Sequence, residues 1–107
     1  MPVYNKLVRD LIPQVIHASG KECRTRILDE EEYKKELLIK LKEESQEYFS
    51  AQSSKESLEE LADMIEVIRA LAVVHGSSWE QLETLREKKA EARGGFQDQV
   101  YLIDVED

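Results

Sequence analysis

Residues 41–63 read LKEESQEYFSAQSSKESLEELAD, and this stretch decides how the chain folds. It carries two pairs of acids, Glu44 with Glu47 and Glu60 with Asp63, and the members of each pair are three positions apart. Spacing of three puts both carboxylates of a pair on one face of a helix. The small, polar segment between the pairs predicts a short connection. Two helices joined in this way would place four carboxylates around one point.

The helix before this connection is expected to begin at Asp29 or Glu30 and to run to about Ser50. Its apolar stripe has intervals of four, four, three and four residues, which is the helical period. Glu44 occupies one position of this stripe, where an apolar side chain is expected. The stripe consists of Tyr33, Leu37, Leu41, Glu44 and Tyr48.

The helix after the connection is expected to begin at Ser54 or Ser57 and to end at His75, before Gly76. It is apolar on two sides, which predicts a central position. A chain of 107 residues has limited means of covering both sides, so an oligomer is expected. One stripe holds Leu58, Leu61, Ile65, Ile68 and Ala72, and the other holds Glu60, Met64, Val67, Leu71 and Val74.

Shorter elements are predicted on both sides of the hairpin. Residues 4–19 read as an extended lead and a helix with Pro13 in its first turn and Asp10 as its N-cap. A further helix is expected from a capping box at Ser77 or Ser78 to about Ala92.

The remaining segments read as extended. Residues 21–28 are loop-like, and residues 100–105 are β-like, which suggests a short strand paired with the N-terminal lead. The fold class is therefore all-α: one domain over residues 1–107, a bundle of four to five helices with short extended terminal segments.

Charge and composition exclude several classes of protein. The chain has 23 acidic and 15 basic residues and a net charge of −8, opposite in sign to a general nucleic-acid binder, so no nucleic-acid polymer is expected as a partner. Cys23 is the single cysteine, which leaves no intramolecular disulfide and no Cys-based metal site. No apolar run approaches the length of a membrane span, and the N-terminal stretch lacks the apolar region of a signal peptide. A cytoplasmic protein without a membrane partner is expected.

The two acid pairs admit three interpretations. Glu44 and Glu60 fall inside apolar stripes, where uncompensated charge is strongly unfavourable. A divalent cation with oxygen ligands relieves this cost, and Mg²⁺ is the usual one. Alternatively, lysine or arginine side chains complete a structural polar network. Acids at helical spacing on solvated faces also occur by chance in so acidic a chain.

The acidic motif resembles a known signature. Glu43-Glu44-Ser45-Gln46-Glu47 followed by Glu60-Leu61-Ala62-Asp63 is similar to the signature of the all-α nucleoside triphosphate pyrophosphohydrolases. These include the MazG-like proteins, the dimeric dUTPases and phosphoribosyl-ATP pyrophosphohydrolase. The resemblance extends to residues 4–13, which look like a MazG-like branch of unassigned substrate, and to residues 89–96, which are similar to a basic segment of the family. It covers nearly the whole chain.

The resemblance implies an enzyme that hydrolyses the α–β phosphoanhydride of an NTP or dNTP to a monophosphate and pyrophosphate. It implies Glu44, Glu47, Glu60 and Asp63 as ligands of Mg²⁺, with Mn²⁺ as an alternative. The metal would neutralise phosphate charge, align the substrate and acidify water. Glu43 matches the leading acid of the motif and would help to position water. We expect Glu43 and Glu47 to be the catalytic residues, with Glu47, or Glu44 through a water, accepting the proton.

Cations must hold the remaining phosphate oxygens. The family's basic segment implies this role for Lys89 and Arg93, which otherwise are surface cations complementing a helix C-terminus. Asn5, Lys6 and Arg9 form a second group that could reach the substrate from the N-terminal lead, or else are surface residues. The sequence has no Gly-x-x-x-x-Gly-Lys motif, which excludes a P-loop mechanism.

Three functions are therefore open at this point. The first is a nucleotide pyrophosphohydrolase in nucleotide-pool house-cleaning, with a nucleotide as substrate. The second is phosphoribosyl-ATP hydrolysis in histidine biosynthesis, with the same chemistry and fold. The third is a non-catalytic helical interaction module. For either enzyme, the resemblance implies a homo-oligomer, a dimer or tetramer, with sites near subunit interfaces.

Overall fold

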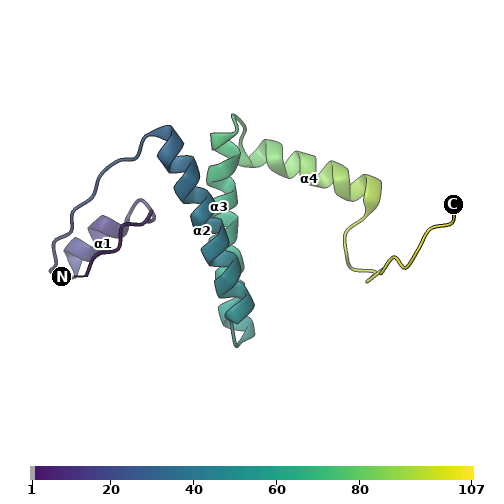
Figure 1. The fold of residues 1–107 in the computed structure, drawn as a ribbon, viewed down its shortest axis with the longest axis horizontal. Coiled ribbons are helices and arrows are strands. Elements are labelled where there is room, and N and C mark those ends of the chain that lie inside the picture. The colour runs from purple at the N-terminus through teal and green to yellow at the C-terminus, as the bar shows by residue number, and fades with distance from the viewer. Residues whose placement is uncertain (1) are drawn as a thin grey trace.

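A computed structural model describes residues 2–107, and four helices make up its regular structure (Figure 1). No strand occurs among these described residues, which confirms the predicted all-α class. The first residue of the predicted domain lies outside the described residues. The helices are α1 (Ile12–Ala18), α2 (Glu30–Ser50), α3 (Ser54–Val74) and α4 (Trp79–Arg93).

Helices α2 and α3 form the predicted hairpin and lie side by side (Figure 1). The Asp29 side chain caps α2 by accepting a hydrogen bond from the Glu32 backbone N–H at 2.8 Å. The Ser53 side chain caps α3 in the same way, from the Glu56 N–H at 3.1 Å. The Glu56 carboxylate in turn accepts from the Gln52 N–H at 3.0 Å. These short-range bonds fix the turn that brings the two helices together.

The core of the hairpin is small. Leu37 of α2 and Val67 and Ala72 of α3 are its buried apolar residues among residues 2–107, and Glu44 is buried with them. The α3 stripe that contains Glu60 and Val67 thus supplies the side that packs on α2.

The other α3 stripe is open to solvent in its first part, whereas Ala72 at its end is buried. Leu58 is 66% exposed and Ile65 is 46% exposed. This agrees with the expectation that one chain has limited means of covering both sides of α3, and among the described helices only α2 and α4 come close to α3.

The outer helices extend away from the hairpin. Helix α4 touches α3 only where the chain turns at Gly76, and it then runs outward (Figure 1). Helix α1 has no Cα atom within 8 Å of another helix. The radius of gyration is 18.4 Å, whereas a compact chain of this length has about 13 Å. Within residues 2–107, no helix is both long enough and apolar enough to cross a bilayer.

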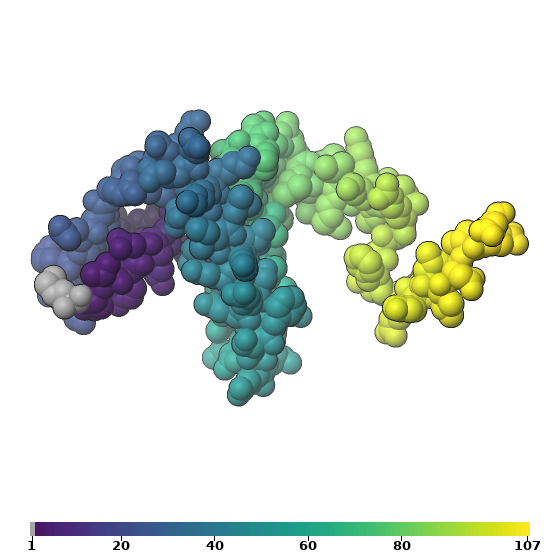
Figure 2. Space-filling model, viewed as in Figure 1, coloured from purple at the N-terminus to yellow at the C-terminus, as the bar shows by residue number. Residues whose placement is uncertain are grey.

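Two predictions about the ends of the chain are wrong. Leu11, not Asp10, is the N-cap of α1, and no side chain caps that helix, although Pro13 does lie in the first turn. Residues 100–105 form no strand. The two chain ends lie on opposite sides of the molecule, so the segment finds no edge with which to form a hydrogen-bonded ladder (Figures 1 and 2).

Replacing Leu37 by alanine tests the hairpin core. We expect Leu37→Ala to lower the free energy of unfolding by about 2–5 kcal/mol, because it leaves a cavity between α2 and α3. Leu102→Ala is the matched control, since Leu102 is 74% exposed. We expect that change to stay within about 0.5 kcal/mol of the wild type in urea unfolding. Equal losses in both variants would contradict this account of the core.

Candidate functional site

Three carboxylates converge between the two long helices. Glu44 and Glu47 come from α2, and Glu60 comes from α3. One oxygen of each can be chosen so that all three lie within 4.8 Å of one another. Because α2 and α3 pack through the stripes that contain Glu44 and Glu60, the hairpin itself forces these acids together. Three of the four predicted metal ligands thus meet at one point, which we call the carboxylate cluster.

Each of the two innermost carboxylates keeps one buried oxygen without a partner. Glu44 is only 8% exposed, and its Oε1 lies 3.6 Å from Lys40 Nζ. Its Oε2 has no hydrogen-bond partner, and neither has Oε2 of Glu60, although both atoms are buried. Buried polar atoms are normally paired, and a lone buried oxygen costs free energy. Lys40 is therefore part of a polar network, but it leaves two oxygens free for a proton or a cation.

Crowding of the acids changes the titration of Glu60. Its pKa is raised from 4.5 to about 7. The main cause is a hydrogen bond that the protonated carboxyl shares with Glu47, followed by burial and then by the neighbouring Glu44. Near neutral pH, the metal-free cluster thus holds a proton on Glu60 in part of the molecules.

The fourth predicted ligand, Asp63, has a different partner. Arg9 Nη2 donates a hydrogen bond to Asp63 Oδ1 at 2.7 Å. The pair is partly open to solvent, with side-chain exposures of 56% for Arg9 and 39% for Asp63. Asp63 remains one helical turn from Glu60 but is not among the three converging acids. No spacing in the sequence predicts this ion pair, because Arg9 and Asp63 are 54 positions apart.

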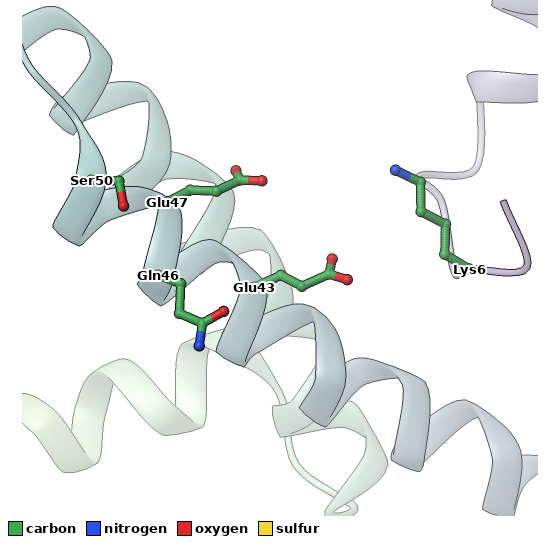
Figure 3. A pocket seen from close by; sticks show the side chains of 5 residues that line it. All are labelled: Lys6, Glu43, Gln46, Glu47 and Ser50. Atoms are coloured by element: carbon green, nitrogen blue, oxygen red, sulfur yellow. The ribbon is translucent and has the colours of Figure 1, made fainter.

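An open groove of about 410 Å³ lies beside the cluster (Figure 3). Glu43 and Glu47 project into it from α2, and the ammonium of Lys6 faces them from the N-terminal lead (Figure 3). Glu43 is half-buried, and its Oε2 lies 3.7 Å from Lys40 Nζ. The groove is lined by Lys6, Glu43, Gln46, Glu47 and Ser50.

The two predicted groups of phosphate-binding cations are placed differently. Lys6 lines the groove opposite Glu43 and Glu47, and Arg9 pairs with Asp63 beside the cluster. Asn5, beside them, adopts a left-handed backbone conformation with φ of +45°. Lys89 and Arg93 belong to the last turns of α4, whose C-terminal end points away from the hairpin (Figure 1). Within one chain, the structure does not bring these two to the cluster.

The raised pKa of Glu60 predicts how stability depends on pH. Between about pH 4.5 and 7 the folded, metal-free protein binds more protons than the unfolded chain, so the free energy of unfolding falls as pH rises through this window. We expect Glu60→Gln to remove the part of this decrease in unfolding free energy that comes from Glu60. The variant should therefore have a higher melting temperature than the wild type at about pH 8 in EDTA. Thermal unfolding of both proteins at about pH 5 and about pH 8 measures it.

Glu59→Gln, which alters the exposed neighbouring acid, is the control and should follow the wild type. If Glu60→Gln lost as much stability as the wild type between these pH values, the titration of Glu60 would not be the cause of the loss.

Comparisons with known proteins leave the family open. A scan against protein-family models found no match, and searches of curated proteins and of solved structures found no matching relative. The resemblance stated from the acidic motif and its flanking segments therefore rests on those residues, and the function must be argued from the geometry of the cluster.

Proposed function

We propose that this chain is a Mg²⁺-dependent nucleotide pyrophosphohydrolase of the MazG-like, all-α type, which cleaves the α–β phosphoanhydride of an NTP or dNTP. One observation carries the proposal: three carboxylates converge between α2 and α3, with buried oxygens that have no partner. Nucleotide-pool house-cleaning in the cytoplasm is the proposed setting.

The residues at the cluster fit a hard divalent cation. Carboxylate oxygens are the ligands that Mg²⁺ prefers, and the unpartnered oxygens of Glu44 and Glu60 are free to bind. Glu44, Glu47 and Glu60 would hold the ion, and Asp63 would join them from the next turn of α3. When bound, Mg²⁺ supplies positive charge against phosphate oxygens and makes water more acidic. Mn²⁺ has the same ligand preference.

The other groups divide the work of binding and proton transfer. Glu47 is exposed at the edge of the groove, where it can accept a proton from water. Glu43 is held by Lys40 and faces the same groove, which suits a residue that orients that water. Lys6 and Arg9 supply positive charge beside the cluster for phosphate oxygens. Hydrolysis yields the monophosphate, pyrophosphate and a proton.

We also propose that the active protein is a homo-oligomer, a dimer or a tetramer. The extended shape and the open α3 stripe support this, because a single chain leaves Leu58, Leu61 and Ile65 partly in solvent. A second copy could cover this stripe. It could also bring Lys89 and Arg93 toward a neighbouring cluster, which one chain does not do.

The oligomer is tested by light scattering coupled to size exclusion. We expect a mass of two or four chains for the wild type, and Ile65→Lys should shift it toward one chain because it buries a charge in the contact. Glu66→Lys, a neighbouring exposed position, controls for added positive charge. A wild-type mass of one chain at all concentrations would overturn the oligomer.

The reaction is tested by pyrophosphate release. We expect release from one or more members of a panel of standard and modified NTPs and dNTPs, with Mg²⁺ and not with EDTA, and with the monophosphate as co-product. Phosphoribosyl-ATP belongs in the panel, since its turnover alone would assign the alternative enzyme. Absence of release from every member, with Mg²⁺ binding demonstrated, would favour a non-catalytic helical module.

The same assay tests the cluster. We expect Glu60→Gln to lower turnover by about 100-fold or more while the protein stays folded, because it removes an anionic ligand. Glu59→Gln, one position away on α3 and outside the cluster, should retain turnover. Wild-type turnover by Glu60→Gln would show that the cluster is not the active site.

A further inference from the structure

The N-terminal segment is attached to the hairpin through one specific polar contact. Helix α1 has no close backbone approach to another helix. The hydrogen bond from Arg9 to Asp63 joins two positions that are 54 apart in the sequence. Every other side-chain hydrogen bond found within residues 2–107 joins positions at most six apart. Within residues 2–107, this ion pair is therefore the side-chain hydrogen bond that ties the N-terminal segment to α3.

The same contact occupies an acid of the metal site. Asp63 lies one turn after Glu60 on α3, so its carboxylate belongs beside the cluster. In the structure Asp63 Oδ1 accepts the Arg9 guanidinium at 2.7 Å, while the other three acids converge without it. A guanidinium and a divalent cation can each neutralise the carboxylate of Asp63, and Mg²⁺ carries twice the charge of a guanidinium. The two are therefore competitors for Asp63.

The exposure of the pair makes an exchange feasible. Both side chains are more than one-third exposed, and ion pairs open to water are weak because water and salt screen them. Glu44, in contrast, is about nine-tenths buried and keeps an unpartnered oxygen. The buried part of the cluster therefore already offers a ligand atom to a cation. A cation seated on the cluster would need to displace only the exposed guanidinium to gain a further ligand.

We propose that Arg9 is a built-in counter-ion that occupies Asp63 in the metal-free protein and is displaced when a divalent cation binds, which releases the N-terminal segment. The inference rests on the proposed metal site and adds a conformational step to it. The released Arg9 then stands beside the cluster, free to pair with an anionic group of the substrate. Metal binding and exposure of this cation are thereby coupled.

Calorimetric titration of the full chain with Mg²⁺ tests the competition. We expect Arg9→Ala to bind Mg²⁺ about two- to fivefold more tightly than the wild type, the factor that an exposed ion pair represents. In an Asp63→Asn background the same change should have no effect, because the competition acts through Asp63. An equal gain in both backgrounds would mean general charge repulsion, and weaker binding by Arg9→Ala would mean that Arg9 positions Asp63 for the metal. Either result overturns the proposal.

A matched control separates net charge from position. Arg26→Ala also removes one positive charge and an exposed ion pair, with Glu32 at 2.9 Å. Glu32 lies three turns of α2 before Glu44, so this pair is remote from the cluster. We expect Arg26→Ala to bind Mg²⁺ like the wild type. A gain equal to that of Arg9→Ala would contradict competition at Asp63.

A distance measurement reports the release directly. Spin labels at Cys23, the single native cysteine, and at Gln52→Cys in the α2–α3 connection span the N-terminal segment and the hairpin. We expect the distance distribution to broaden when Mg²⁺ is added. Adding Arg9→Ala or Asp63→Asn should give the broad distribution without metal. Distributions that do not respond to Mg²⁺ or to either substitution would overturn the release.

The outcomes also separate this inference from the proposed function. Mg²⁺-dependent pyrophosphate release together with an unchanged affinity in Arg9→Ala would overturn the counter-ion role alone. A flat titration of the wild-type protein with Mg²⁺ would overturn both, since the cluster would then bind no metal.

Discussion

The presence of carboxylates inside the contact between α2 and α3 is the constraint on which the rest of the structure depends. Glu44 is as well buried as the apolar residues Leu37, Val67 and Ala72 that form the core. An anion in that position is unfavourable unless a partner is near. Lys40 provides one partner, and a proton on Glu60 provides relief near neutral pH. Neither satisfies all the buried oxygens. Keeping several anionic oxygens close together therefore lowers the stability of the hairpin when no cation is bound.

Under the proposed function, stability and activity would be opposed at Glu60. A neutral side chain there would relieve repulsion among the acids, whereas a metal site needs the full negative charge. The same opposition accounts for the local placement of positive charge in a chain of net charge −8. Lys6, Arg9 and Lys40 all lie close to the acids, although acidic residues dominate the surface elsewhere.

The open architecture places the carboxylate cluster on a scaffold with few buried apolar residues. The described core is small for a chain of this length, and α1, α4 and the C-terminal segment contribute little to it (Figures 1 and 2). The hairpin nevertheless positions Glu44, Glu47 and Glu60 by local means, through capped helix starts and a short, hydrogen-bonded connection. The deep part of the cluster thus depends on the most regular part of the fold, and its outer part depends on the N-terminal lead.

Much of this could be read from the sequence, because helical periodicity and capping are local properties. The starts of α2 and α4 follow from Asp29 and Ser78, and the placement of Glu44 and Glu60 in apolar stripes follows from spacing alone. Local rules failed at the chain ends. Asp10 does not cap α1, and residues 100–105 remain unpaired, since a strand requires a partner that only the tertiary arrangement supplies.

The sequence by itself determined the helical hairpin and the convergence of Glu44, Glu47 and Glu60, because both depend on contacts between residues close in the chain. Only the tertiary structure decided that Arg9 meets Asp63, that Lys6 faces Glu43 and Glu47, and that one stripe of α3 stays open. These outcomes depend on where segments distant in the sequence come to lie. No periodicity encodes that placement; it results from how the flexible lead and the two long helices pack together.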